Sequence, residues 1–151
     1  MTDLPGDPLE LQGDTYRDEH LAFISEGLHY AVNAASVLEI ITQYAVTRIP
    51  KVPDYLPGVF NLRGQIVPII DLRLRMGRPP ADDAETPCVV VLDIGGLPVG
   101  LRVEQVSHVV RIRREDIAPP PPNNRQAFIS GLVNVDNTVY RMLDCERLAA
   151  V

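Results

Sequence analysis

The chain has 151 residues, of which 46% are hydrophobic and 23% are charged, and its formal net charge is −6. This length suits one domain or two small subdomains, and the composition is that of an ordinary globular protein. The sequence has no apolar run of about 18 residues and begins with an acidic stretch, which argues against a membrane span and a secretory signal. We therefore expect a cytoplasmic protein.

The charge is distributed unevenly along the chain. Residues 1–19 carry six acidic side chains and one arginine, whereas the remaining sequence holds 13 basic and 14 acidic side chains. We expect a flexible acidic segment over 1–17 and a single domain over 18–151. A nearly neutral domain with an acidic extension does not suit nucleic acid binding, which normally needs a basic surface.

Short apolar segments separated by turn-forming residues predict an all-β fold. The candidate strands, in chain order, cover 20–25, 28–33, 45–50, 58–63, 65–72, 88–94, 97–103, 108–113, 129–135 and 138–144. Short helices are predicted at 34–41 and 145–150, with one helical turn at 72–76.

The sequence contains an internal repeat, with halves of about 18–86 and 87–151. Residues 58–74, moved forward by 73 positions, align without a gap on 131–147, and an earlier segment aligns with a shift of 69. Identical residues at matched positions include Gly58 and Gly131, Asn61 and Asn134, and Asp71 and Asp144. We therefore expect two similar five-stranded barrels. The repeat leaves open whether a strand crosses from one barrel to the other.

The repeat provides an internal control for the turn at Arg63 and Gly64. The second copy has Asp136 and Asn137 at these positions, so the second position keeps a residue that tolerates positive φ. The first position changes from a cation to an anion, and the turn therefore does not require arginine. We assign the bend to Gly64 and interpret Arg63 as a recognition residue.

Glu39 is the other charge that the two copies do not share, because His108 occupies the matched position. In the helix predicted at 34–41, the apolar residues would share one face and Glu39 would lie off it. We hypothesise that Glu39 and Arg63 form an ion pair across one face of the first barrel. Two unrelated solvated charges are the alternative.

Other candidate sites have plainer structural interpretations. Asp71 and Asp144 each precede a short helical stretch, so we interpret them as helix N-caps rather than paired catalytic carboxylates. The three histidines lack metal-ligand spacing, and Cys88 and Cys145 lack a CxxC motif and are interpreted as free, buried thiols. We predict no catalytic residue, metal or cofactor. A small enzyme or ligand-binding barrel that uses Asp71 and the histidines is the alternative from another class.

The segment YLPGVFNLRGQIVPIIDLRLRMG closely resembles the signature of CheW-like domains, the coupling proteins of bacterial chemotaxis. VTRIPKVPDYLPG, GLRVEQVSHVVRI and GLVNVDNTVYRMLDCERL are similar to other parts of the same family, and the resemblance covers about 18–149. The resemblance implies two intertwined five-stranded Src-homology-3-like β-barrels with short helices.

The resemblance also implies a non-enzymatic adaptor that couples chemoreceptors (methyl-accepting chemotaxis proteins) to the histidine kinase CheA. One surface would bind the cytoplasmic tip of the receptor and others the regulatory domain of CheA, so the cytoplasmic protein would reach membrane-associated arrays only through its partners. The partner-binding positions that the resemblance implies are Val37, Glu39, Asn61, Leu62, Arg63, Gly64, Gly100 and Val103. A CheW-like scaffold of a pilus-motility or other non-flagellar chemosensory array is the alternative.

Overall fold

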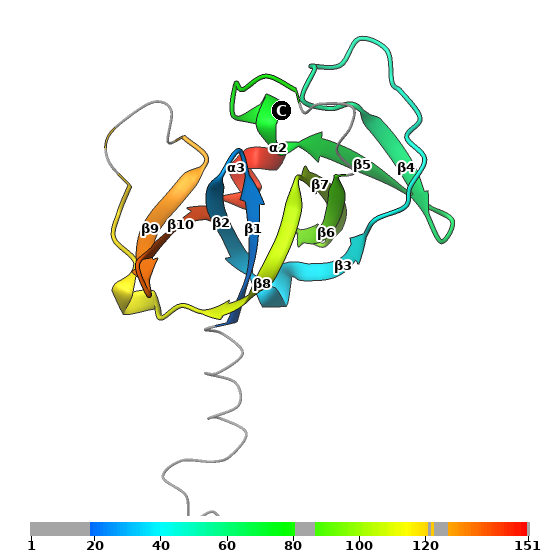
Figure 1. The fold of residues 1–151 in the computed structure, drawn as a ribbon. Coiled ribbons are helices and arrows are strands. Elements are labelled where there is room, and N and C mark those ends of the chain that lie inside the picture. The colour runs from blue at the N-terminus through cyan, green and yellow to red at the C-terminus, as the bar shows by residue number, and fades with distance from the viewer. Residues whose placement is uncertain (1–18, 81–86, 121, 123–126, 151) are drawn as a thin grey trace, which may run out of the picture.

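The computed structural model describes residues 19–80, 87–120, 122 and 127–150, which form two five-stranded sheets with short helices (Figure 1). The first half of the chain contributes β1 (Glu19–Ser25), β2 (Leu28–Asn33), β3 (Val37–Ile41), β4 (Gly58–Leu62) and β5 (Gln65–Asp71). The second half contributes β6 (Cys88–Ile94), β7 (Leu97–Val103), β8 (Gln105–Arg111), β9 (Ile129–Val135) and β10 (Thr138–Leu143). The helices are η1 (Ala34–Ser36), α2 (Leu72–Arg75), η2 (Arg114–Asp116) and α3 (Cys145–Ala149). The predicted fold class is confirmed, while the predicted acidic segment at 1–17 lies outside the described residues.

Each sheet combines strands from both halves of the chain. Sheet A has the order β8-β1-β2-β10-β9, and sheet B has the order β3-β6-β7-β5-β4. The hairpin β1–β2 thus joins three strands of the second half, and the hairpin β6–β7 joins three strands of the first half. Four pairs join the two halves: β2 with β10 and β5 with β7 are parallel, and β1 with β8 and β3 with β6 are antiparallel, like the pairs within each half. The two barrels are therefore intertwined by a whole hairpin in each direction.

The largest apolar core lies between the two sheets. Phe23 from sheet A, Leu101 from sheet B and Leu148 from α3 all belong to it, and each is at most 2% exposed. A smaller core fills each barrel, around Val133 in sheet A and around Val67 in sheet B. Burial of these side chains fixes the position of one barrel against the other and supplies most of the favourable folding free energy.

Two repeat-matched glycines mark the places where the chain crosses its own hairpins. A Cβ atom on Gly58 would collide with the carbonyl oxygen of Thr47, and one on Gly131 would collide with the side chain of Ile117. Isolated bridges next to both glycines, Thr47 with Val59 and Ala118 with Leu132, hold the crossing segments in place. The repeat therefore keeps glycine here because two backbones approach closely.

Arg75, the last residue of α2, connects sheet B to α3. The Cζ atom of Arg75 lies 4.1 Å from the ring centroid of Tyr55 and 4.5 Å from that of Phe128. Its Nε donates to the carbonyl oxygen of Leu148 at 3.0 Å, and its Nη2 donates to the carbonyl oxygen of Ala150 at 2.6 Å. One guanidinium thus stacks between two rings and satisfies carbonyl groups at the end of α3 that lack helical partners.

Two predicted elements differ from the structure. The helix predicted at 34–41 is wrong, because η1 covers only its first three residues and β3 follows. The aliphatic residues of β3 pair with β6 instead, and this tertiary pairing outweighs the short helical spacing. The strand predicted at 45–50 is also wrong: only Thr47 forms a bridge, in a segment that Pro50 and Pro53 interrupt. Within the described part of the chain, no helix is long and apolar enough to cross a membrane.

The contacts of Arg75 predict a measurable loss of stability when its guanidinium is removed. We expect Arg75→Ala to lower the free energy of unfolding by about 2–4 kcal/mol, because two ring contacts and several charged hydrogen bonds are lost together. Urea unfolding followed by circular dichroism measures this difference. Arg113→Ala is the control, since this arginine is exposed and should change stability by less than about 0.5 kcal/mol. Equal stability of the two variants would contradict the role of Arg75.

Candidate partner-binding site

The turn between β4 and β5 places Arg63 in an unusual backbone conformation. Arg63 has a φ of 52° and Gly64 a φ of 85°, and the matched turn has 52° at Asp136 and 69° at Asn137. Positive φ at both central positions is typical of the type I′ hairpin turn. The bend is therefore shared by both residues, which corrects its assignment to Gly64 alone. Asn, Asp and Gly favour this conformation, whereas arginine does not.

Asn61 supports the same turn from the preceding strand. Its Oδ1 accepts a hydrogen bond from the backbone N–H of Gly64 at 2.8 Å. Asn134 does the same for Asn137 at 3.0 Å in the other barrel. This shared hydrogen bond explains why the repeat keeps asparagine at both positions.

Arg63 and Glu39 form the predicted ion pair. Nη1 of Arg63 donates to Oε2 of Glu39 at 2.8 Å, and Nη2 donates to Oε1 at 2.6 Å. The hydrogen bonds to Glu39, together with its charge, raise the pKa of Arg63 above its usual value. The side chain of Arg63 is 74% exposed, compared with 28% for Glu39. The pair thus links the turn of the hairpin β4–β5, which projects from the rest of the fold in Figure 1, to the edge strand β3, and it holds a solvent-facing arginine there.

The other barrel has no equivalent of this pair. His108 takes the place of Glu39, and its Nε2 lies 3.3 Å from the hydroxyl oxygen of Tyr140. Its Nδ1 lies 2.7 Å from the hydroxyl oxygen of Ser107. Asp136 takes the place of Arg63 and forms no ion pair within the described residues. The exposed ion pair is therefore a property of sheet B, where the repeat has diverged.

Large apolar side chains are exposed close to the pair in sequence and strand register. Leu38 and Ile40 flank Glu39 in β3 and are 56% and 43% exposed, and Ile66, which pairs with Asn61 across the hairpin, is 61% exposed. Exposed large apolar side chains are typical of surfaces that bind proteins, but successive residues of a strand point to opposite faces, so Ile40 does not share the face of Glu39. Sequence analysis missed Leu38 and Ile66. A strand prediction for β3, with its alternation of two residues, would have placed Leu38 and Ile40 on one solvent-facing side. The helix predicted at 34–41 gave a different pattern, so this exposure was not predicted.

The predicted partner-binding residues fall into two groups. Those on β3 or the hairpin β4–β5, which lie at the two opposite edges of sheet B, are Val37, Glu39, Asn61, Leu62, Arg63 and Gly64. Gly100 and Val103 are buried in β7 instead. A Cβ atom on Gly100 would lie 2.8 Å from Cγ1 of Val89, so packing explains this glycine. Gly100 and Val103 cannot contact a partner directly in this structure, and a binding role for the first group stays a prediction.

The carboxylates considered for catalysis are helix caps. The Oδ1 atoms of Asp71 and Asp144 each accept a hydrogen bond, at 3.2 Å, from the backbone N–H three residues further along the chain, as predicted. Asp71 is also paired with Arg102, whose Nε donates to its Oδ2 at 2.9 Å. The capping and ion-pair contacts therefore give Asp71 a structural role.

The two cysteines are free thiols, as predicted, and both are half-buried. Burial, together with the charges of Asp144 and Glu146, raises the pKa of Cys145 to about 11. This thiol stays protonated near neutral pH and is a poor nucleophile. Within the described residues, no group of three or more His, Cys, Asp or Glu residues could hold a metal ion.

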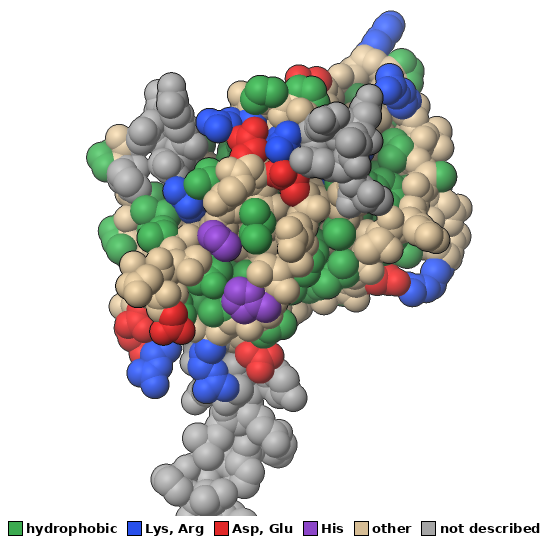
Figure 2. Space-filling model, in the orientation of Figure 1, with side chains coloured by type: hydrophobic (Ala, Val, Ile, Leu, Met, Phe, Trp, Pro, Cys, Tyr) green, Lys and Arg blue, Asp and Glu red, His purple; other side chains and the backbone are tan. Residues whose placement is uncertain are grey.

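Basic and acidic side chains are interspersed on the face shown in Figure 2. They gather mainly at its upper and lower margins, and hydrophobic side chains and histidines lie between them (Figure 2). This face carries no extended basic patch of the kind that binds a phosphate backbone.

Comparisons with known proteins give a consistent result. The family model for the CheW-like domain matches residues 19–151. The chain is 35% identical to the chemotaxis protein CheW of Klebsiella aerogenes over 92% of this chain and 86% of that protein, and 26% identical to CheW of Bacillus subtilis over 84% and 83%. It is also similar to the crystal structure of the scaffolding protein TtCheW from Thermoanaerobacter tengcongensis. That match has a TM-score of 0.83 and 28% identity, and it covers 89% of this chain and 94% of the other.

The positive φ of Arg63 predicts that the turn gains nothing from arginine. We expect Arg63→Asn to unfold at the same temperature as the unaltered protein or slightly higher, because asparagine favours this turn and the exposed ion pair adds little stability. Thermal unfolding followed by circular dichroism measures this. Asn61→Ala is the contrasting variant and should unfold at a lower temperature, because the backbone N–H of Gly64 loses its acceptor. A clear drop for Arg63→Asn would show that the turn needs arginine for its own stability.

Proposed function

Because the chain belongs to the CheW-like domain family, we propose that it is a non-enzymatic adaptor that couples chemoreceptors to the histidine kinase CheA in bacterial chemotaxis. Its likeness to a protein described as a scaffold supports this class of function. At the level of residues, the proposal rests on the ion pair of Glu39 and Arg63, which holds an exposed arginine at the end of sheet B. Nothing in this geometry favours the pilus-motility alternative.

The chemistry of Arg63 is suited to binding a protein. A guanidinium has five N–H donors, and Glu39 accepts from two of them, which leaves three for acceptors on a partner. The planar fork matches a carboxylate or a pair of backbone carbonyl groups. Ile66, which lies on the same hairpin as Arg63 and is 61% exposed, adds apolar area that would become buried when a partner binds.

We extend the proposal to particular partners and positions. The surface around Arg63 would contact the cytoplasmic tip of the receptor or the regulatory domain of CheA, and the adaptor would be cytoplasmic and located at receptor arrays through these partners. The contacting positions are Val37, Glu39, Asn61, Leu62, Arg63 and Gly64. Gly100 and Val103 would act indirectly, because their packing supports sheet B beneath this surface.

The first test removes the arginine. We expect Arg63→Ala to fold normally but to lose coupling, with about tenfold or weaker co-purification with receptor fragments or CheA from the same genome and a matching loss of kinase activation. Asp136→Ala alters the equivalent turn position of the other barrel and is the matched control, which should couple normally. Unchanged coupling by Arg63→Ala would overturn the proposed role of this residue.

A charge exchange separates recognition from structure. In the double variant Glu39→Arg with Arg63→Glu, the ion pair is restored with its direction reversed. If Arg63 itself binds the partner, we expect this variant to fold like the unaltered protein and still fail to co-purify. Normal coupling by the double variant would show that the pair acts only within the fold.

A further inference from the structure

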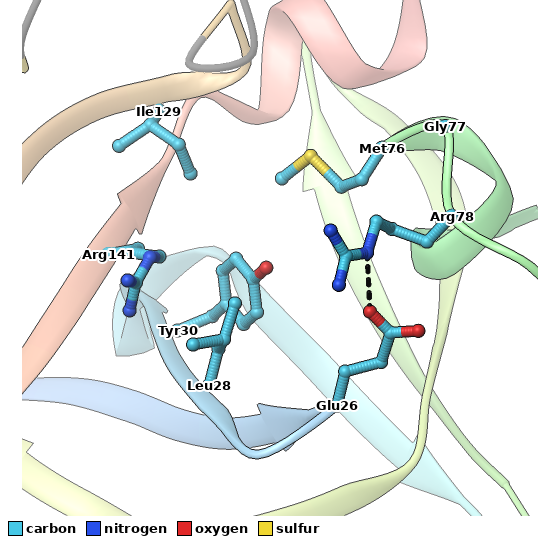
Figure 3. A pocket seen from close by; sticks show the side chains of 8 residues that line it. All are labelled: Glu26, Leu28, Tyr30, Met76, Gly77, Arg78, Ile129 and Arg141. Carbon is cyan, nitrogen blue, oxygen red and sulfur yellow. Dashed lines mark hydrogen bonds and ion pairs between the residues drawn. The ribbon is translucent and has the colours of Figure 1, made fainter.

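A cavity of about 360 Å³ opens between sheet A and the segment that follows α2 (Figure 3). It is lined by Glu26, Leu28, Tyr30, Met76, Gly77, Arg78, Ile129 and Arg141. None of these residues belongs to β3, β4 or β5. The cavity is therefore distinct from the proposed partner-binding surface, and its volume is within the range of sites for small molecules, about 300–1,000 Å³.

Apolar side chains form one part of the wall of the cavity. Leu28 and Ile129 from sheet A and Met76 from the end of α2 lie around the ring of Tyr30, so apolar atoms face the interior from both elements (Figure 3). Tyr30 is itself held by a stacked contact with Phe23, whose ring centroid is 6.0 Å away. These side chains form a preformed surface for the carbon skeleton of a ligand.

The acidic groups at the edge of the cavity are already neutralised. Glu26 accepts a hydrogen bond from Nε of Arg78 at 2.6 Å, and Glu104 is paired with Nη2 of Arg73 at 2.9 Å. Burial alone would raise the pKa of Glu104, but hydrogen bonds from the backbone of Glu26, from Ser25 and from Arg73 lower it overall. The charges of the two carboxylates and the two guanidinium groups therefore cancel, and these four side chains add no net charge to the cavity.

Arg141 adds a positive charge that no carboxylate among the described residues balances by an ion pair. It lines the wall opposite Arg78 (Figure 3). The Nη groups of Arg78 point into the cavity, because only its Nε is bonded to Glu26. Burial raises the pKa of Tyr30, so its hydroxyl stays protonated and can donate near neutral pH. The cavity thus combines an apolar wall with several donors and one unbalanced positive charge.

We propose that this cavity binds a small organic carboxylate whose body is apolar. The carboxylate would lie between Arg141 and Arg78, where planar guanidinium groups match its geometry, and the apolar body would pack against Leu28, Met76 and Ile129. A single unbalanced charge suits a monocarboxylate better than a phosphate, which carries more charge. An adaptor with such a site would respond to a small molecule directly. This inference does not depend on the proposed coupling function.

The test uses the full chain and phenylacetate as the probe. We expect phenylacetate to shift amide signals in ¹H–¹⁵N spectra around Arg141 and Arg78 in a saturable manner, and its neutral isostere phenylacetamide to bind about tenfold or more weakly. Arg141→Gln should weaken phenylacetate binding to a similar extent. Arg113→Gln, which removes an exposed arginine elsewhere, should leave binding unchanged, and so should Arg63→Ala.

Several results would overturn the proposal. Equal binding of the acid and the amide would show that charge plays no part, and unaltered binding by Arg141→Gln would exclude this arginine. No saturable shift with phenylacetate or with a set of aliphatic and aromatic monocarboxylates would mean that the cavity is not a small-molecule site. Saturable shifts with an acidic peptide alone would assign the cavity to a protein partner instead. Leu28→Trp fills the cavity and should abolish binding of phenylacetate, while the ¹H–¹⁵N spectrum stays that of a folded protein; unaltered binding by this variant would place the probe elsewhere.

Discussion

The apolar core between the two sheets is the constraint on which the remaining structure depends. Phe23 and Leu101 come from hairpins that have each crossed into the barrel of the other half, and both are almost completely buried in that core. Because the parallel pairs of β2 with β10 and β5 with β7 close the sheets, neither half can complete a barrel from its own strands. Arg75 stabilises the same junction, because its guanidinium contacts the rings of Tyr55 and Phe128 and donates to the carbonyl oxygen of Leu148 in α3. A rigid junction keeps β3 and the hairpin β4–β5 in one relative position, and so keeps Glu39 within reach of Arg63.

Much of the fold could be predicted from the sequence, because the repeat and the turn residues are local signals. The exchange of hairpins could not, since strand order depends on pairing between residues far apart in the chain. β3 was missed for a related reason. Val37–Ile41 has the spacing of a short amphipathic helix as well as that of a strand, and only its pairing with β6 decides between them. Five residues are too few for periodicity alone to choose.

The site was predictable to the extent that the repeat supplied a comparison. The differences between the copies at positions 39 and 63 predicted the ion pair, which the structure contains. The asparagine that both copies share, Asn61 and Asn134, stabilises the turns instead. The burial of Gly100 could not be read from sequence, because it follows from contacts with Val89 and Phe60 on other strands. The cavity lined by Arg141 was equally hidden. The residues that line it come from separate segments of the chain. Whether an arginine has a carboxylate partner depends on the three-dimensional arrangement of the side chains, which the sequence does not show.

The exchange of hairpins also determines when the chain can finish folding during its synthesis. β1 and β2 leave the ribosome first, but their neighbours β8 and β10 are made roughly 80–110 residues later, a delay of about 5–20 s at about 5–20 residues per second. During that interval Ala22 and Phe23, which are fully buried in the finished protein, have no partners from sheet A's later strands. Sheet A therefore closes only after β9 and β10 have been made, and the nascent hairpin needs protection from aggregation until then.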